Sequence, residues 1–433
     1  LMDCGTSPFS GVDAAKVEVC VTEFEGGEVV KDWTAVAENA AAGAAWSGSI
    51  TLPQGGWYRL RARALDGEGK VLGEAEGAHK WGVGINILCI GQSNMVGQAP
   101  ERPCTAADDL VANYTRSGNW THLTDPYDGA GGSLVPSMGN ALVAELGIPV
   151  GFIPAADSGS GLHAPNPYTN PPHGPTRYWM YYTTPDDTST LYGKAVTRAK
   201  AAGGVELAVW NQGETDGAIS VAKETYESDM KTLLSRLRKD LDNPELPIFL
   251  CQIGTHNPNI SDYAAYTAIR SAQHDLDDGE NFFLAATEME FARKDTAHYR
   301  KAGMDEIGRR VANSVLFYYG ESDYYRGPYI SGASYADDSR KVIDVRITHR
   351  GGTDITPAAG NIPGFSVLDN ANEVAVASAV RLNATTVRLT LESAVAGSGQ
   401  VRYLYGLNPY PDTDVSGNPK TSDLQKDAIV VKD

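Results

Sequence analysis

The stretch Gly91–Met95, which reads Gly-Gln-Ser-Asn-Met, holds the residues best placed to do chemistry. It follows an apolar run from Ile85 to Ile90 that predicts a buried strand. A serine on the turn after such a strand lies at the carboxyl edge of a sheet, where open α/β sheets build their sites. Ser93 is therefore a candidate nucleophile. A serine hydroxyl is a weak nucleophile at its own pKa, so it needs a general base, and that base needs an orienting group.

A carboxylate and an imidazole lie three residues apart in the segment Asp295–His298. This segment follows the apolar run Phe282–Ala286 and precedes a helical pattern of apolar residues that begins at Met304. We therefore expect both side chains on a loop at the end of a late strand. That position makes His298 the candidate base and Asp295 the candidate group that orients it.

A third polar segment, Asn211–Asp216, follows another apolar run, Leu207–Trp210. The run predicts a buried strand, so its polar residues also belong at the carboxyl edge. Glu214 and Asp216 could form the acid/base pair of a glycosidase, which needs two carboxylates flanking a sugar bond. We favour a supporting role in which they accept hydrogen bonds and hold the loop, because nothing outside this segment points to a glycosidase.

The composition excludes several classes of protein. With 433 residues, 42% of them hydrophobic and 21% charged, the chain predicts a packed protein of two or three domains. Its net charge of −18 argues against nucleic-acid partners and anionic membranes, because phosphates select for basic patches. No apolar stretch is long enough to span a bilayer, and no basic-then-apolar signal peptide is present.

The cysteines and histidines give no metal-binding pattern. Cys89 and Cys251 lie inside predicted strands, where we expect inert core residues. The chain has no Cys-x-x-Cys motif and no cluster of histidines and cysteines. We therefore expect neither a metal nor any other cofactor.

The patterning divides the chain into three domains: 1–84, 85–320 and 321–433. In the first, alternating segments predict antiparallel strands at Val17–Val21, Trp46–Leu52 and Trp57–Ala64. In the second, strands alternate with helical patterns, which predicts a mostly parallel sheet covered by helices on both faces. Its predicted strands are Ile85–Ile90, Pro149–Ala155, Leu207–Gln212, Pro247–Gly254 and Phe282–Thr287. The third returns to β character, for which an immunoglobulin-like β-sandwich is the simplest interpretation.

The three polar segments together, in this order and each after a predicted strand, resemble the SGNH hydrolase superfamily. The resemblance covers roughly residues 85–320, and the branch is the sialate O-acetylesterase-like one, which includes acetylxylan esterases. It implies a three-layer α/β/α, flavodoxin-like catalytic domain, here flanked by N-terminal and C-terminal β domains. It also implies a carbohydrate O-acetylesterase, and hence an acetylated carbohydrate as substrate.

The resemblance assigns roles to particular residues. It makes Ser93 the nucleophile, His298 the base and Asp295 the orienting group. It places the oxyanion hole at the Ser93 N–H, the Gln212 side chain and a glycine after the second strand. That glycine is Gly159, with Gly161 as the alternative, because Asp157–Gly161 departs from the usual Gly-Gly pair. Supporting roles fall to three further residues: Gln92, Asn94 and Glu214.

Substrate contacts are expected from two loops at the site edge. The segment from Ser160 to Asp187 is rich in aromatic residues and prolines, which suits stacking on a sugar ring. His163 and Trp179 are its candidate contacts, and a loop that packs on itself is the alternative. His256 follows the fourth predicted strand and is a third candidate.

The sequence thus predicts a serine esterase that removes O-acetyl groups from sialic acid or an acetylated polysaccharide. The alternatives are an acetylxylan esterase specifically, or a non-catalytic carbohydrate-binding or adhesion protein. We expect a secreted, periplasmic or cell-surface location.

Overall fold

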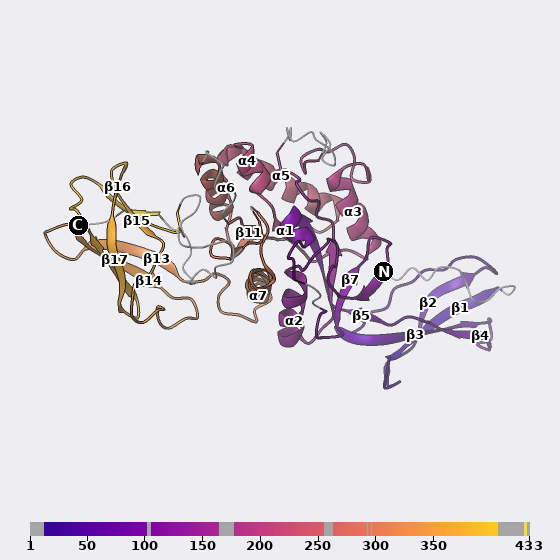
Figure 1. Ribbon diagram of the computed structural model, residues 1–433. Coiled ribbons are helices and arrows are strands. Elements are labelled where there is room, and N and C mark those ends of the chain that lie inside the picture. Colours follow the sequence, from indigo (N-terminus) through magenta and orange to yellow (C-terminus); the bar gives the residue numbers. More distant parts are fainter. Residues whose placement is uncertain are drawn as a thin grey trace.

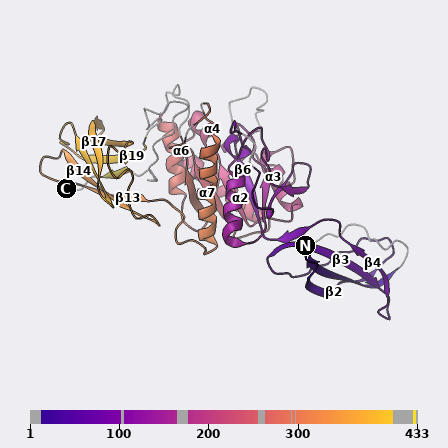
Figure 2. The same cartoon turned by 60° about the horizontal axis from the view of Figure 1, so that its bottom comes forward.

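The structure is a computed structural model that describes residues 13–101, 105–163, 177–254, 263–291, 293–295, 297–405 and 428–430. A central α/β part lies between an N-terminal β-sheet and a C-terminal pair of β-sheets (Figures 1 and 2). None of the helices within these ranges is both long and apolar enough to cross a membrane.

The central sheet has seven strands in the order β12-β11-β10-β6-β9-β7-β8. All neighbouring strands pair in parallel except β7 with β8. The strands are β6 (Ile85–Gly91), β7 (Val111–Tyr114), β8 (Trp120–His122), β9 (Val150–Pro154), β10 (Leu207–Asn211), β11 (Ile248–Gln252) and β12 (Phe282–Thr287). The mostly parallel sheet is confirmed. The order β9-β6-β10-β11-β12 is that of flavodoxin-like folds, in which ligands bind where the chain switches direction, here between β6 and β10.

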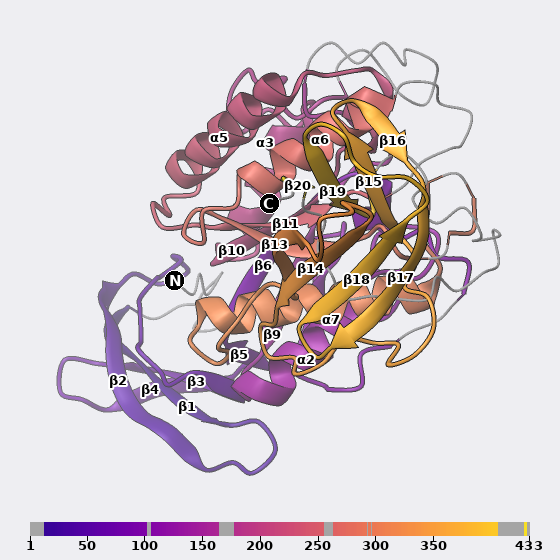
Figure 3. The same cartoon turned by 90° about the vertical axis from the view of Figure 1, so that its left-hand side faces the viewer.

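Helices cover both faces of this sheet, as Figure 3 shows. On one face α2 (Val135–Leu146) and α7 (Lys301–Tyr318) pack in one hydrophobic cluster, and on the other α3 (Leu191–Ala201), α5 (Lys223–Asp240) and α6 (Tyr263–Asp275) pack in a second. Alternate residues of β6 enter the two clusters, with Ile87 in the first and Leu88 in the second. A strand covered on both faces is apolar throughout, which explains the uninterrupted apolar runs in the sequence. The predicted three-layer α/β/α architecture is confirmed.

The N-terminal sheet differs from its prediction in one strand. Its strands are β1 (Ala14–Glu23), β2 (Val29–Ala40), β3 (Gly55–Leu65), β4 (Val71–Glu76) and β5 (Trp81–Val83). The predicted strand Trp46–Leu52 is wrong, since that segment holds only an isolated bridge at Gly48. The missed strand, β2, lies at the edge of the sheet and has no fully buried residue, so it lacks the alternation that marks a half-buried strand.

Two four-stranded antiparallel sheets form the C-terminal part, in the orders β13-β14-β18-β17 and β16-β15-β19-β20. The first contains β13 (Tyr329–Tyr335), β14 (Val342–Thr348), β17 (Val376–Asn383) and β18 (Thr386–Leu391). The second contains β15 (Phe365–Asp369), β16 (Asn372–Val374), β19 (Gly399–Tyr403) and β20 (Ala428–Val430). Residues of both sheets share one hydrophobic cluster, for example Val345 and Val387 with Val367 and Val401, so the two sheets form a sandwich.

Candidate active site

Ser93 lies on a sharp turn at the carboxyl end of β6, where it begins the short helix α1 (Ser93–Val96). The turn depends on Gly91, which has a φ of +135° and pairs with Asn211 of β10. A Cβ atom on Gly91 would lie 2.1 Å from the Asn211 carbonyl oxygen, so no larger residue fits without a shift of the strands. The exposed fraction of Ser93 is 7%, so the residue is buried at the sheet edge.

Asp295 and His298 interact directly on the loop between β12 and α7. The His298 Nδ1 atom lies 2.9 Å from Oδ2 and 3.1 Å from Oδ1 of Asp295. The Asp295 Oδ1 atom also accepts hydrogen bonds from the backbone N–H groups of Ala297 and His298. Burial works to raise the pKa of Asp295, but these hydrogen bonds outweigh it, so its pKa lies below the ordinary value. An ionised Asp295 that accepts the Nδ1 proton leaves Nε2 of His298 able to take up a proton.

The residue after Ser93 links the two segments. Asn94 is fully buried, and its Nδ2 atom donates to the carbonyl oxygen of Ala297 at 3.2 Å and to Oε1 of Glu214 at 2.7 Å. Ala297 immediately precedes His298, so this hydrogen bond ties the turn of the nucleophile to the loop of the imidazole. The Glu214 carboxylate is close enough to His298 for their charges to interact.

Gln92 anchors the same turn to the strand beside it. Its backbone N–H donates to the Asn211 carbonyl oxygen at 2.8 Å. Its Oε1 atom accepts hydrogen bonds from the N–H groups of Gly213, at 3.4 Å, and Thr215, at 3.2 Å. The start of α4 (Glu214–Ala218) is thereby held against the Ser93 turn.

Two buried carboxyl groups lie beneath the site, and the sequence interpretation missed one of them. Glu288 directly follows β12, and its Oε1 atom accepts a hydrogen bond of 2.6 Å from Nδ2 of Asn211. Burial, and next the Glu214 carboxylate, raise the pKa of Glu288 well above its ordinary value. Burial also raises the pKa of Glu214. A single polar residue after a buried strand was the only signal in the sequence that could have identified Glu288.

Four oxygen atoms of this cluster have no hydrogen-bond partner among the described residues. They are Oδ1 of Asn94, Oδ1 of Asn211, Oε2 of Glu214 and Oε2 of Glu288. All four are acceptors, so the cluster is short of donors rather than of acceptors. A protonated carboxyl group supplies such a donor, which agrees with the raised pKa of both glutamates.

The loop after β9 carries the two glycines considered for the oxyanion hole. It is joined to the Ser93 turn by a hydrogen bond of 3.1 Å from the Asp157 N–H to the Gly91 carbonyl oxygen. Gly159 has a left-handed φ of +72°. The N–H of Gly161 donates to the Arg177 carbonyl oxygen at 3.2 Å.

Gln212 is fully buried and its amide is already occupied. Its Nε2 atom donates to the Ser160 carbonyl oxygen at 3.2 Å and to Oδ2 of Asp216. The Tyr226 hydroxyl donates to the Gln212 backbone carbonyl at 3.0 Å. With both amide hydrogens taken by protein acceptors, the side chain holds the loop after β9 in place.

Asp216 binds the same loop through its backbone. Its carboxylate accepts hydrogen bonds from the N–H groups of Leu162, at 2.8 Å, and His163, at 2.9 Å. Burial raises the pKa of Asp216. Asp216 and Glu214 are 0% and 4% exposed, so neither faces an open groove as the acid and base of a glycosidase must.

Of the three residues expected to contact the substrate, the structure describes His163 and Trp179. The His163 side chain is 40% exposed, and its Nδ1 lies 2.6 Å from Oδ2 of Asp229. Trp179 is fully buried, packs edge-on against Trp210, and donates its indole N–H to the Ser160 hydroxyl. Its ring is therefore not available to stack on a sugar, contrary to expectation. His256 lies outside the described residues.

Within the described ranges, we find neither a metal-binding group of side chains nor a cysteine placed for catalysis. No group of three or more histidine, cysteine, aspartate or glutamate side chains there could hold a metal ion. Cys89 and Cys251 are buried, and burial raises the pKa of both thiols, as expected for inert core residues. Cys20 is also a free, buried cysteine.

The chain matches one family model and is similar to several solved structures. A family model described as "Carbohydrate esterase, sialic acid-specific acetylesterase" matches residues 85–317, which is more than half of the chain. No curated protein matches the chain. The structure is similar to that of a carbohydrate acetylesterase from Xanthomonas citri, with a TM-score of 0.63 and 17% identity over 92% of this chain and 90% of that one.

Two smaller solved structures also match. A protein from Arabidopsis thaliana has a TM-score of 0.40 and 20% identity, over 54% of this chain and 97% of its own. A carbohydrate acetylesterase from Sinorhizobium meliloti has a TM-score of 0.36 and 13% identity, over 54% of this chain and 100% of its own. The similarity to the Xanthomonas citri structure shows a shared fold.

Proposed function

The chain belongs to the carbohydrate esterase, sialic acid-specific acetylesterase family, and on this premise we propose that it is a serine esterase that removes O-acetyl groups from a carbohydrate. The observation that carries the proposal is the contact of 2.9 Å between His298 Nδ1 and Asp295 Oδ2. Asn94 ties this pair to the turn that presents Ser93. The three residue types are those that nucleophilic acyl transfer requires.

In the first half of the reaction, the Ser93 Oγ atom attacks the carbonyl carbon of the acetyl ester. Nε2 of His298 takes the hydroxyl proton, and the ionised Asp295 stabilises the imidazolium that forms. The bond between the acetyl carbon and the sugar oxygen then breaks. The sugar hydroxyl leaves with the proton from His298, and the acetyl group stays on Ser93.

In the second half, water replaces the sugar. His298 takes a proton from the water, whose oxygen attacks the acetyl carbon of the acyl-enzyme. The bond to Ser93 Oγ breaks, acetate leaves, and the serine regains its proton from His298. No metal and no other cofactor is needed for either half.

The oxyanion that forms in both halves needs N–H donors aimed at it. The N–H of Ser93 is the first, because the N–H groups of a first helical turn lack acceptors within the helix. We assign the second to Gly159, which lies on the loop that Asp157 joins to the Ser93 turn. Gln212 would contribute only by releasing the Ser160 carbonyl oxygen or Asp216.

The substrate we propose is sialic acid or a polysaccharide that carries O-acetyl groups, with acetylxylan as the narrower alternative. The family description and the name of the Xanthomonas citri relative both support a carbohydrate ester. Of the expected contacts that the structure describes, His163, on the loop after β9, has a partly exposed side chain. We assign it a contact with the sugar.

Hydrolysis of p-nitrophenyl acetate by the wild type and by Ser93→Ala tests the mechanism. We expect the variant to lose nearly all turnover. Equal rates for the wild type and the variant would rule out the serine mechanism. Acetate release from acetylated xylan, acetylated sialic acid and acetylated pectin then separates the substrates. Glycan binding by the wild type without turnover of any ester would favour the non-catalytic alternative.

A further inference from the structure

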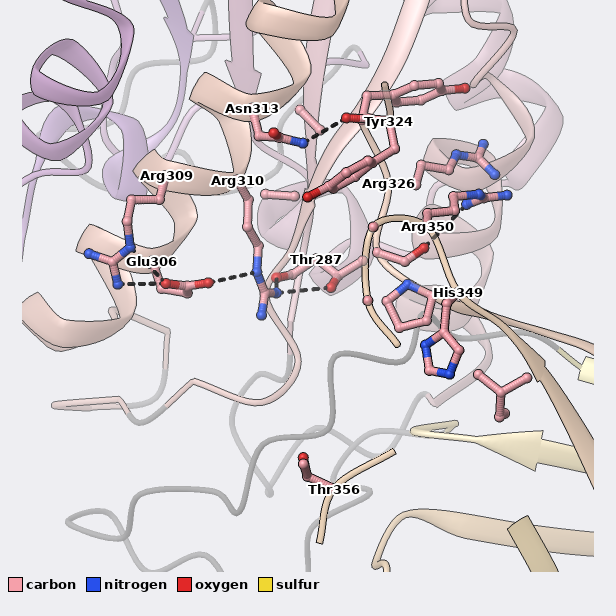
Figure 4. Close-up of a pocket in the computed structure, with 18 of the residues that line it drawn as sticks. Thr287, Glu306, Arg309, Arg310, Asn313, Tyr324, Arg326, His349, Arg350 and Thr356 are labelled. Atoms are coloured by element: carbon pink, nitrogen blue, oxygen red, sulfur yellow. Dashed lines mark hydrogen bonds and ion pairs between the residues drawn. The ribbon is translucent and has the colours of Figure 1, made fainter. Parts of the chain in front are cut away.

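A cavity lies away from Ser93, between the helical layer and the C-terminal sandwich. Its volume is about 500 Å³, within the range of sites for small molecules. Figure 4 shows Glu306, Arg309 and Arg310 of α7 on one side of it, and Tyr324, Arg326 and Arg350 on the other. None of the triad or oxyanion residues lines it. The cavity is therefore a candidate site of its own.

The lining is rich in arginine although the protein is acidic. Four arginines and two carboxylates line the cavity, in a chain whose net charge is −18. Three of these arginines already have carboxylate partners: Arg309 pairs with Glu306, and Arg310 and Arg326 pair with Glu290 and Asp277, which lie outside the lining. Asp354 pairs with Arg381, also outside the lining, at 2.7 Å. Among the described residues, Arg350 is the lining arginine that no carboxylate neutralises, and this one cation favours an anionic ligand.

Arg350 is the arginine best suited to hold that anion. In the part of the chain that the structure describes, no carboxylate pairs with it. Its Nη1 atom donates to the Gly327 carbonyl oxygen at 3.3 Å, and its guanidinium lies 4.2 Å from the centre of the Tyr329 ring. Stacking and one hydrogen bond fix the group while its other N–H donors stay available. A guanidinium held in this way matches the two oxygens of a carboxylate.

Tyr324 adds an aromatic surface to the same cavity. Its exposed fraction is 37%, which is high for a large aromatic side chain. The ring packs closely against Gly351, where a Cβ atom would lie 2.1 Å from the Tyr324 Cζ atom. The backbone carbonyl oxygen of Tyr324 accepts a hydrogen bond of 2.8 Å from Asn313 Nδ2. A fixed, exposed ring beside a cation suits a sugar that carries a charge.

We propose that this cavity binds an acidic sugar residue, with its carboxylate on Arg350 and its ring against Tyr324. A cavity of about 500 Å³ is much larger than an inorganic anion needs and fits a monosaccharide unit. The site draws on both α7 and the sandwich, so the ligand would bridge the catalytic and C-terminal parts. The inference concerns a second site and does not depend on turnover at Ser93.

Isothermal titration of the whole chain with sodium glucuronate, glucose and sodium sulfate, at constant ionic strength, tests the proposal. We expect glucuronate to bind and glucose to bind much more weakly. Arg350→Gln should weaken glucuronate binding about tenfold or more, as expected for the loss of a hydrogen bond between charged groups. Tyr324→Ala should weaken it too, whereas Tyr324→Phe keeps the ring and should bind like the wild type.

Arg402→Gln is the matched control. Arg402 lies in the same sandwich and stacks on an aromatic ring, 4.0 Å from the centre of Tyr405, but it does not line the cavity. It should leave glucuronate binding unchanged, and all four variants should hydrolyse p-nitrophenyl acetate at the wild-type rate. That rate separates a failure of this site from a failure of the esterase.

Three results would overturn the proposal. Equal binding of glucose and glucuronate would show that charge is not recognised. Sulfate binding as tightly as glucuronate, with no effect of Tyr324→Ala, would leave an inorganic anion site only. Equal losses in Arg350→Gln and Arg402→Gln would place the ligand elsewhere on the surface.

Discussion

Asn94 donates a hydrogen bond of 3.2 Å from Nδ2 to the carbonyl oxygen of Ala297. The two residues are the immediate neighbours of Ser93 and His298, so a single hydrogen bond relates the candidate nucleophile to its candidate base. The second donor of the same amide goes to Oε1 of Glu214. Asn94 is therefore oriented by a buried carboxyl group and in turn orients the loop of the imidazole.

Replacing Asn94 by alanine should lower kcat by about 10²-fold, because a shift of about 1 Å between reacting groups has an effect of that size. KM should change little, since Asn94 is buried and does not face the substrate. Steady-state kinetics with p-nitrophenyl acetate gives both values. Asn86→Ala is the control, because Asn86 also donates from Nδ2 to a backbone carbonyl, that of Gly204, at the opposite end of β6. Equal kcat losses in the two variants would argue that Asn94 only stabilises the fold.

The triad residues should act as a unit. Ser93→Ala, His298→Ala and Asp295→Asn should each lower kcat by orders of magnitude, on the order of 10⁴-fold for the first two. The double variant of Ser93 and His298 should be no worse than either single variant, because the serine has no function without its base. Additive losses in the double variant would contradict a shared step.

Stability should respond to pH through Glu288. Its pKa is raised in the folded protein, so above the ordinary value of 4.5 the folded state keeps a proton that the unfolded state has released. The contribution of Glu288 to stability is therefore complete below that value and is lost as the pH rises toward the raised pKa. Glu288→Gln can still accept the hydrogen bond from Asn211 but cannot ionise, so it escapes this loss.

We therefore expect the free energy of unfolding of Glu288→Gln to improve relative to wild type as the pH rises from about 4.5 to about 8. Urea denaturation at several pH values measures the difference. Glu25→Gln, at an exposed turn of the N-terminal sheet, controls for the loss of one negative charge. A difference for Glu288→Gln that stays constant with pH would show that the buried carboxyl does not hold its proton.

The central fold could be predicted because its strands are buried on both faces. Each of the five predicted strands is an apolar run closed by polar or turn residues, and each is present. The hairpin of β7 and β8 was missed, since Val111–Tyr114 is only four residues long and includes the polar Asn113. Length and alternation carry too little information in a strand of that size.

Trp179 shows why the site was harder to predict than the fold. An aromatic residue in a proline-rich segment looks exposed, but this indole fills a space against Trp210 and the Ser160 hydroxyl. Burial of this kind depends on packing between segments that are distant in the sequence. Residue type and position after a strand identify what reaches the sheet edge, but not which side chains face inward.

Gln212 is the residue whose role is best decided by experiment. Both amide hydrogens donate to protein acceptors, Ser160 and Asp216, so Gln212→Ala should leave the Ser160 carbonyl oxygen without a donor, whereas Oδ2 of Asp216 keeps its hydrogen bond from Leu162. Such a loss costs about 1–3 kcal/mol for each unsatisfied group, which predicts a clear fall in the midpoint of urea unfolding.

If the amide only positions the loop after β9, KM should rise along with the loss in kcat. If one hydrogen turns to the oxyanion in the transition state, kcat should fall by about 10²–10³-fold with KM unchanged. Because burial of the amide is complete in the free protein, we expect the first pattern.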